Sequence, residues 1–290
     1  MIIAQLILEG LATGACYGLL GIAVVIIYKT SEVVNFAQGE MGMFSSFIIY
    51  HLLVNYNVPF FQALLITLAL SFFMGILIEF LFLKPVKNAH LLDTIVLTLG
   101  ADMLILGLAS WKWSYEQKQL NIPWSYEKIH DFQGIVITDW AIAIITTSIV
   151  SMVFLYLFFK YTKFGIAMRA TQQNKFATKL MGANVERVFS AAWAFSSVIG
   201  ALAAMFFITR STLDPACMME PFLKTFAAAV LGGLMSIPGV FIGGLMLGVI
   251  ENLFGFVWPA WKPIVAFVVI VIVLCLRPSG LFAKHYIRKV

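Results

Sequence analysis

The sequence predicts an all-α fold, a polytopic bundle of transmembrane helices with about eight to nine membrane segments. Of the 290 residues, 61% are hydrophobic and only 11% are charged, and the mean hydropathy is +0.95. A soluble domain of this size is less apolar and about twice as charged. The apolar residues gather into runs that approach the length of about 20 residues needed to cross a bilayer. We interpret residues 1–290 as a single membrane domain.

Nine candidate segments follow one another along the chain. The first has no basic stretch before it and no small-residue cleavage site, so we interpret it as a retained span rather than a signal peptide. The segments that begin at 41, 222 and 263 are short for a full crossing. In chain order the segments are 6–28, 41–54, 60–83, 94–111, 137–159, 188–208, 222–235, 238–256 and 263–276.

Lys and Arg residues predict the orientation, because cytoplasmic loops carry an excess of them. The basic C-terminus is therefore expected in the cytoplasm and the N-terminus outside. This count requires that 222–256, which is rich in Gly and interrupted by Pro, enters and leaves on the same side as a tight hairpin or a broken pair of half-helices. The same rule explains the pI of about 9.1 without nucleic-acid binding. The cytoplasmic cations are then Lys29, Lys84, Lys87, Lys160, Lys163, Arg169, Lys175, Lys179, Arg187, Arg277, Lys284, Arg288 and Lys289.

The segment 112–138 is the longest extramembrane stretch on the outer side. Aromatic residues alternate there with charged ones, as in the aromatic belt at a membrane–water interface. A loop lying on the membrane surface and a docking surface for an outer partner both fit this pattern. The aromatic residues in and beside this loop are Trp111, Trp113, Tyr115, Trp124 and Tyr126.

The segment 160–187 is a basic, helix-forming region between two apolar runs. Thr171 or Asn174 can cap a short helix, and Gly182 can end it. Apolar residues between them recur at helical spacing and form a ridge on one face. Two interpretations remain open, a positively charged loop resting on lipid headgroups and a ridge that binds a soluble partner. The ridge consists of Phe176, Ala177, Leu180 and Met181.

Enzyme signatures are missing from the sequence. There is no phosphate-binding G-x-x-x-x-G-K-[ST] loop, no H-E-x-x-H zinc motif and no G-x-S-x-G nucleophile elbow. We therefore predict no catalytic residue and no metal site. Acids within apolar segments are expected to face protein or water. We interpret Glu79 and Glu251 as reaching the interface near the ends of their spans, and Glu40 and Asp102 as members of a polar pathway.

Several motifs together resemble the membrane permeases of branched-chain amino acid ABC importers, along nearly the whole chain. The family pattern N-F-A-H-G-E appears here as NFAQGE at 35–40, with Gln38 in place of His. The family stretch G-x-A-M-R-A-T, then E-A-A and L-M-G-I-N, appears as GIAMRAT at 165–171, FAT at 176–178 and LMGAN at 180–184. Near the end, AAVLGGLMSIPG at 228–239 and RPSGLFA at 277–283 follow the family with Met235 and Ala283 in place of Gly.

The resemblance implies that 160–187 is a cytoplasmic coupling loop that docks into a cleft of an ATPase subunit. Phe176 stands where an acidic residue is usual, so an apolar contact replaces a polar one. The residues expected to couple to the ATPase are Arg169, Phe176, Ala177, Leu180, Met181 and Gly182. The residues expected to line the pathway are Asn35, Gln38, Glu40, Asp102, Gly232, Gly233 and Ser236. For the glycines, tight helix packing is an equal alternative.

The resemblance further implies a multi-pass permease subunit of the inner or plasma membrane that works by alternating access. Its expected partners are two ATPase subunits, a second permease of related sequence and an extracytoplasmic substrate-binding protein, within membrane lipid. ATP would bind to the ATPase subunits, and this chain would hold no cofactor. Import of urea or simple amides is the alternative within the family. A stand-alone secondary transporter is a further alternative, and it would need no partner at 160–187.

Overall fold

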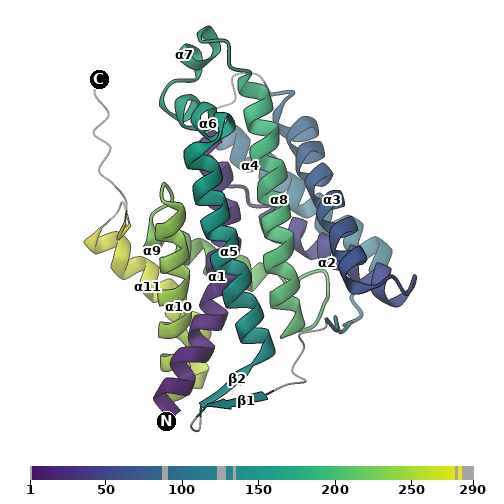
Figure 1. Cartoon of the computed structure of the whole chain (residues 1–290), viewed down its shortest axis with the longest axis vertical. Helices are drawn as coiled ribbons and strands as arrows, with labels where there is room; N and C mark the ends of the chain where they lie inside the picture. The colour runs from purple at the N-terminus through teal and green to yellow at the C-terminus, as the bar shows by residue number, and fades with distance from the viewer. Residues whose placement is uncertain (1, 87–90, 123–128, 133–134, 278–279, 283–290) are drawn as a thin grey trace.

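The computed structural model describes residues 2–86, 91–122, 129–132, 135–277 and 280–282. Its elements form a bundle of long helices (Figure 1). They are α1 (Ile2–Ser31), α2 (Gln38–Val54), α3 (Phe60–Ile78), the π-helix η1 (Glu79–Leu83), α4 (Leu91–Trp113), β1 (Ile129–Phe132), β2 (Ile135–Thr138), α5 (Asp139–Tyr161), α6 (Lys163–Gln173), α7 (Lys175–Leu180), α8 (Val185–Thr209), α9 (Met219–Gly232), α10 (Ile237–Val257), the 3-10 helix η2 (Pro259–Trp261) and α11 (Lys262–Leu276).

The predicted all-α membrane bundle is confirmed. Within the described residues, seven helices are long and apolar enough to span a membrane. Each of the nine predicted segments overlaps a helix. Seven of these helices are the candidate spans, and the remaining two are the short helices α2 and α9. The chain is therefore a multi-pass membrane protein.

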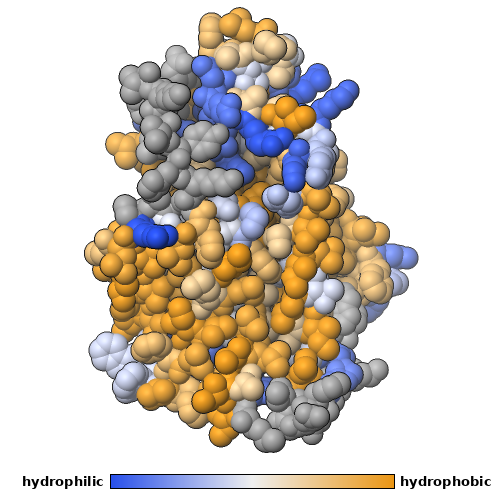
Figure 2. Space-filling view, turned by 60° about the vertical axis from the view of Figure 1, so that its left-hand side comes forward, coloured by the Kyte–Doolittle hydropathy of each residue, from blue (hydrophilic) through white to orange (hydrophobic). Residues whose placement is uncertain are grey.

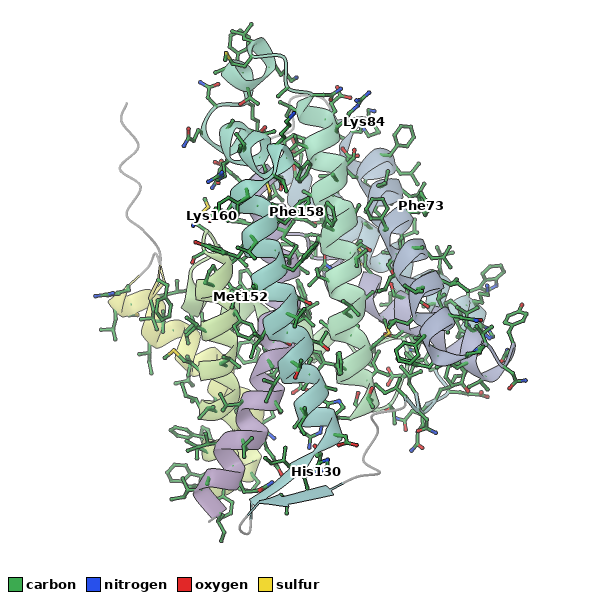
Figure 3. All side chains as sticks on the ribbon, in the orientation of Figure 1. Phe73, Lys84, His130, Met152, Phe158 and Lys160 are labelled. Carbon is green, nitrogen blue, oxygen red and sulfur yellow. The ribbon has the colours of Figure 1, made fainter. Side chains whose placement is uncertain are left out.

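The outer surface of the bundle carries an apolar band (Figure 2). Large apolar side chains are exposed along α3, α4, α5 and α11, as expected for helices that face lipid tails. Phe73 on α3 points away from the bundle (Figure 3). Hydrophilic residues gather toward the end of the molecule that holds α6 and α7 (Figure 2).

The helix α1 is the centre of the bundle and is buried over most of its length. It packs against α10, α8, α9 and α5. Gly10, Gly14 and Gly18 recur every fourth residue along the face that meets α10. A Cβ atom on Gly14 would lie 2.6 Å from the carbonyl oxygen of Gly244, so the two backbones are in direct contact. Small residues at this spacing allow close helix approach within a membrane.

The helices α9 and α10 form the hairpin that the interrupted sequence predicts. Gly233 adopts a φ of +93°, which favours glycine, and ends α9. Ser236 caps α10, because its hydroxyl accepts a hydrogen bond from the Gly239 backbone N–H. The turn lies near α6, since Ser236 and Arg169 line a common cavity. The chain thus passes toward the α6–α7 end along α9 and returns along α10.

A β-hairpin, which the sequence analysis did not predict, closes the opposite end of the bundle. Its antiparallel strands pair Ile129 with Thr138 and Phe132 with Ile135. The side chain of Gln5 donates to the Val136 carbonyl and accepts from the Val136 N–H, each at 2.9 Å. The start of α1 is thereby joined to β2. The hydroxyl of Thr138 caps α5, so this helix begins at Asp139 rather than at the predicted residue 137.

The two ends of the bundle are referred to below as the α6–α7 end and the β-hairpin end. Lys84 and Lys160 lie toward the first, and His130 lies on the hairpin at the second (Figure 3). Of the predicted outer aromatic residues, Trp124 and Tyr126 lie outside the described residues. The same holds for four of the predicted cytoplasmic cations, namely Lys87, Lys284, Arg288 and Lys289.

Candidate functional site

Two short helices, α6 and α7, project from the bundle between α5 and α8 (Figure 1). A single residue, Asn174, ends α6 and begins α7 in an extended conformation. Its side chain caps α7 by accepting a hydrogen bond from the Ala177 N–H at 2.9 Å. Of the two predicted caps Asn174 is therefore correct, whereas Thr171 lies inside α6 and donates to the Ala167 carbonyl. Gly182, with a φ of +83°, ends the turn after α7 as predicted.

The tip of α7 exposes three large apolar side chains. Phe176, Leu180 and Met181 are 72%, 73% and 87% exposed, and Ala177 beside them is exposed as well. The surrounding region is rich in Lys. The three large apolar side chains are mostly exposed, so they contribute little to packing within this chain. A contiguous exposed apolar patch marks an interaction surface. We name these four residues the α7 tip.

The predicted coupling residue Arg169 lies apart from the α7 tip. Its guanidinium group donates hydrogen bonds to the backbone carbonyl groups of Lys160, at 3.0 Å, and Gly165, at 3.4 Å. It therefore fastens α6 to the end of α5. The role of Arg169 that this geometry supports is to hold the base of the projection in place.

A cluster of aromatic rings connects α6 to the membrane helices. Phe164 on α6 packs against Phe158 on α5 and Phe195 on α8, with ring centroids 5.9 Å and 6.1 Å apart. Phe195 also meets Phe72 of α3 at 6.0 Å, and Phe158 lies at the centre of this region (Figure 3). Sequence reasoning missed this cluster, because its rings come from four separate helices. The cluster therefore packs α6 against α5 and α8 and, through Phe195, extends to α3.

Two of the predicted pathway residues, Asn35 and Gln38, form a buried hydrogen-bonded join. The Asn35 amide donates to Gln38 Oε1 at 3.1 Å, and the Ser196 hydroxyl donates to the same oxygen at 2.9 Å. Gln38 in turn donates to the Ser196 carbonyl at 3.2 Å. The join fixes the start of α2 inside the bundle against α8. Ser196, which sequence reasoning did not single out, completes it.

The structure brings together two acids that the sequence placed on separate segments. The carboxyl groups of Glu40 on α2 and Asp102 on α4 contact each other. The start of α2 also meets the start of α9, since a Cβ atom on Gly39 would lie 3.1 Å from Cβ of Phe222. Two short helices thus begin side by side within the bundle. Short helices that begin inside a membrane bundle are typical of transport proteins.

The remaining predicted pathway residues lie in the α9–α10 hairpin. Gly232 packs directly against the Gly239 backbone, which agrees with the packing alternative for this glycine. Gly233 and Ser236 belong to the turn, and Ser236 lines a cavity of about 340 Å³ at the α6–α7 end. That cavity also contains three cationic side chains, Lys29, Lys160 and Arg169.

A larger cavity of about 510 Å³ opens toward the β-hairpin end, and we name it the hairpin-end cavity. Six helices contribute to its wall, which includes the aromatic side chains of Tyr17, Trp140 and Phe207. Burial raises the pKa of the Cys217 thiol, which also lies on this wall, to about 12. The charged residues that line the cavity are Glu9, Arg210, Glu220, Lys224, Glu251 and Lys262.

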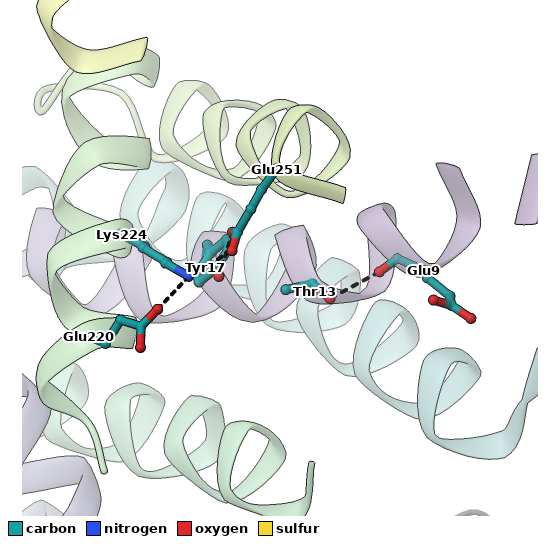
Figure 4. A network of polar contacts seen from close by, with 6 residues as sticks. All are labelled: Glu9, Thr13, Tyr17, Glu220, Lys224 and Glu251. Carbon is teal, nitrogen blue, oxygen red and sulfur yellow. Dashed lines mark hydrogen bonds and ion pairs between the residues drawn. The ribbon is translucent and has the colours of Figure 1, made fainter. Parts of the chain in front are cut away.

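A network of polar contacts connects three helices at this cavity (Figure 4). The ammonium group of Lys224 on α9 donates to Glu251 on α10 at 2.6 Å and forms an ion pair with Glu220 at 2.7 Å. The second oxygen of Glu251 accepts a hydrogen bond from the Tyr17 hydroxyl of α1 at 2.8 Å. Glu251 is only 2% exposed, whereas the Glu220 side chain is 66% exposed.

The interpretation of Glu79 and Glu251 as interface-reaching acids is wrong. Glu251 is buried among Lys224 and Tyr17, and Glu79 is buried with its carboxylate hydrogen bonded to Ser190 at 2.8 Å. Position within the span misled the prediction, because the partners come from distant parts of the chain. A buried charge with a dedicated partner marks a site of function in a membrane protein more often than a surface acid does.

Metal binding finds no support in the described part of the chain. No group of three or more His, Cys, Asp or Glu residues there is close enough to hold a metal ion. The two cavities are lined by charged, hydrogen-bonding and apolar side chains.

Comparison with known proteins gives full-length relatives. The chain is 27% identical to LivH, the "high-affinity branched-chain amino acid transport system permease protein" of Salmonella typhimurium, over 99% of this chain and 97% of that one. The protein BraD of Pseudomonas aeruginosa, which carries the same description, is also 27% identical with the same coverage. A probable LivH protein of Methanocaldococcus jannaschii is 26% identical over 91% of this chain and 87% of the relative.

A solved structure, PsaBC from Streptococcus pneumoniae in complex with a Fab, has a similar fold. The TM-score is 0.51 at 11% sequence identity, with 93% of this chain and 91% of the other covered. The likeness extends to the fold alone. The model of the family described as "branched-chain amino acid transport system / permease component" matches residues 6–274. With its bundle of membrane helices and its full-length relatives, the chain belongs to this family of permease components.

Proposed function

We propose that this chain is the membrane permease subunit of an ATP-driven ABC importer for branched-chain amino acids. The α7 tip is the observation that carries the proposal. Three exposed apolar side chains lie at the α7 tip, and the neighbouring helix α6 is packed against the membrane helices by an aromatic cluster. This arrangement suits a surface that binds an ATPase subunit and transmits its movement. ATP belongs to that subunit, and this chain binds no cofactor and catalyses no reaction.

The α6–α7 end faces the cytoplasm in this proposal. Lys84, Lys163, Lys175 and Lys179 lie at this end, which agrees with the excess of cations on the cytoplasmic side of membrane proteins. The C-terminal helix α11 runs toward the same end, which supports a cytoplasmic C-terminus. The β-hairpin end then receives an extracytoplasmic substrate-binding protein. A second permease of related sequence completes the pathway.

The two cavities support transport by alternating access. One opens toward the β-hairpin end and the other lies at the α6–α7 end, with the body of the bundle between them. The hairpin-end cavity carries charges of both signs, which suits an amino acid better than it suits urea or a simple amide, because these are neutral. Asn35, Gln38, Glu40 and Asp102 line neither cavity, and we propose that they form a separate polar region of the pathway.

Replacement of Leu180 by Asp tests the coupling surface. Burial of a leucine side chain in an interface is worth about 1.5–3 kcal/mol, so we expect the recovery of the ATPase subunit with the purified permease to fall at least tenfold. ATP-dependent leucine uptake into proteoliposomes should be lost with it. The matched control is Lys179→Ala, an exposed neighbour on the same helix, which should keep both.

Either of two results would contradict the proposal. One is an unchanged yield of ATPase subunit with Leu180→Asp and also with Met181→Asp. The other is leucine uptake that proceeds without ATP, which would favour a stand-alone carrier. Strong ATP-driven uptake of urea, without uptake of leucine, would keep the importer and correct its substrate.

A further inference from the structure

We propose that the Lys224–Glu220 ion pair in the hairpin-end cavity is a binding site for the ammonium and carboxylate groups of a zwitterionic amino acid. The inference takes from the proposed function only that the transported substrate is an amino acid.

The two ion pairs of Lys224 differ in a way that leaves one of them available to a ligand. Glu251 is fixed, because one of its carboxylate oxygens accepts from Lys224 and the other from Tyr17. Glu220 makes its contact with Lys224 one turn earlier on the same helix, and its side chain is largely exposed on the cavity wall. The Lys224–Glu220 contact is therefore the one that a ligand can open without uncovering a buried charge.

A zwitterion can enter this contact by exchange. Its carboxylate takes the place of Glu220 on the Lys224 ammonium group, and its own ammonium group binds the Glu220 carboxylate. Every charge keeps a partner of opposite sign throughout, and Glu251 continues to hold Lys224 in position. Loss of one partner from a partly buried pair is costly, so a ligand with only one of the two groups binds more weakly.

The rest of the cavity suits the apolar side chain of such a ligand. The Trp140 ring is held in place, because its indole N–H donates to the Phe206 carbonyl at 3.2 Å. Phe207 and Pro221 line the same cavity, and the guanidinium group of Arg210 lies 4.6 Å from the centre of the Trp140 ring. The volume of about 510 Å³ exceeds what one amino acid requires and falls within the range of small-molecule sites.

A series of leucine analogues separates the contributions of the carboxylate and the ammonium group to binding. Leucine carries both charged groups, leucinamide lacks the carboxylate, N-acetyl-leucine lacks the ammonium group, and urea lacks both. If the ion pair only stabilises α9, the four compounds should not differ in their binding on account of these two groups. If it receives a zwitterion, leucine binds best and each of the other three binds at least tenfold more weakly.

The experiment measures binding of radiolabelled leucine to the full-length permease in lipid nanodiscs. Any ATPase and permease subunits that purify with the permease are kept in the same nanodiscs. The substrate-binding protein is omitted, because it would bind leucine by itself. Scintillation proximity gives the affinity, and competition with the three analogues gives the specificity. A ligand-induced change in tryptophan fluorescence that disappears in Trp140→Phe places the ligand in this cavity.

Glu220→Gln is the decisive variant, because Glu220 is exposed and its replacement leaves the buried pair intact. We expect it to weaken leucine binding at least tenfold. Glu116→Gln is the matched control, since Glu116 is exposed in the segment after α4 and does not line the cavity. It should bind leucine like the unmodified protein. Lys224→Met combined with Glu251→Leu removes the charges together and should also abolish binding.

Three results would overturn the inference, namely equal leucine binding by Glu220→Gln, equal competition by leucinamide, or a Kd for leucine above about 1 mM. ATP-dependent leucine uptake by the intact transporter is measured in parallel. If uptake persists while any of these results is found, the importer stands and only this binding site is refuted. If leucine binds with the expected specificity but uptake needs no ATP, the proposed importer fails and the site stands.

Discussion

The contact between α1 and α10 predicts a specific effect of replacing Gly14 by Ala. The added methyl group would lie 2.6 Å from the Gly244 carbonyl oxygen and 2.7 Å from Cα of Leu245. Both are backbone atoms, so neither can rotate away. The two helices would have to separate by about 0.8 Å to reach an ordinary contact of 3.4 Å.

The expected magnitude follows from the tightness of this contact. Forcing an extra methyl group into a packed core costs about 1–3 kcal/mol. In a domain of this size each kcal/mol lowers the melting temperature by about 2–4 °C. The matched control is Gly107→Ala on α4, where an added Cβ would meet nothing within 4 Å. A glycine-to-alanine change at an open helical position is stabilising by about 0.5–1 kcal/mol, so the control should shift the melting temperature upward.

With Cys217 and Cys275 replaced by Ser, a thiol-reactive dye reports the unfolding, because Cys16 lies two residues from Gly14 and is only 1% exposed. Its labelling should begin at a lower temperature in Gly14→Ala than in the unmodified protein. The reasoning is refuted if Gly14→Ala and Gly107→Ala melt at the same temperature. A higher melting temperature for Gly14→Ala would refute it more strongly, since the close approach would then not exist.

Two further predictions concern the hairpin-end cavity. Glu251→Leu should lower the free energy of unfolding by about 3–5 kcal/mol, because it leaves the Lys224 ammonium group without its buried partner. The double variant with Lys224→Met should recover much of that loss in the same melting assay. Equal losses in the single and double variants would contradict a buried ion pair. With Cys16 and Cys275 replaced by Ser, iodoacetamide should modify Cys217 far more slowly in the folded protein than in SDS, because its raised pKa of about 12 keeps the thiolate scarce. The rate of Cys217 modification in the folded protein should still increase with each step in pH from 8 to 10, whereas the rate for an ordinary thiol levels off just above its own pKa. A plateau near pH 9 would show that the Cys217 thiol is not shielded.

Sequence reasoning located the helices well because the signals are local. The apolar runs, the Asn174 cap and the glycine at the end of α7 each act on residues within a few positions of themselves. The exposed ridge at Phe176, Leu180 and Met181 also follows from helical spacing alone. In a membrane protein these local patterns are strong, since every backbone group must be satisfied within its own helix.

The polar contacts of the site could not be predicted in the same way. Lys224 and Glu251 are 27 positions apart, and Glu79 and Ser190 are 111 apart. Their pairing depends on how α9 meets α10 and how η1 meets α8, and the hydropathy pattern does not contain that information. The β-hairpin escaped for another reason, because its strands are only four residues long and their pairing is completed by Gln5 from the far end of the chain.

The helix α1 has a consequence for the whole bundle, since it lines both cavities. Glu9, Thr13 and Tyr17 belong to the cavity at one end, and Lys29 belongs to the cavity at the other. A helix of 30 residues is a rod about 45 Å long, and α5 and α10 run beside it between the same two cavities. Because Gly10, Gly14 and Gly18 hold α1 directly against α10, these two helices share one packed contact between the two cavities. A change in this contact would therefore affect the walls of both cavities at once.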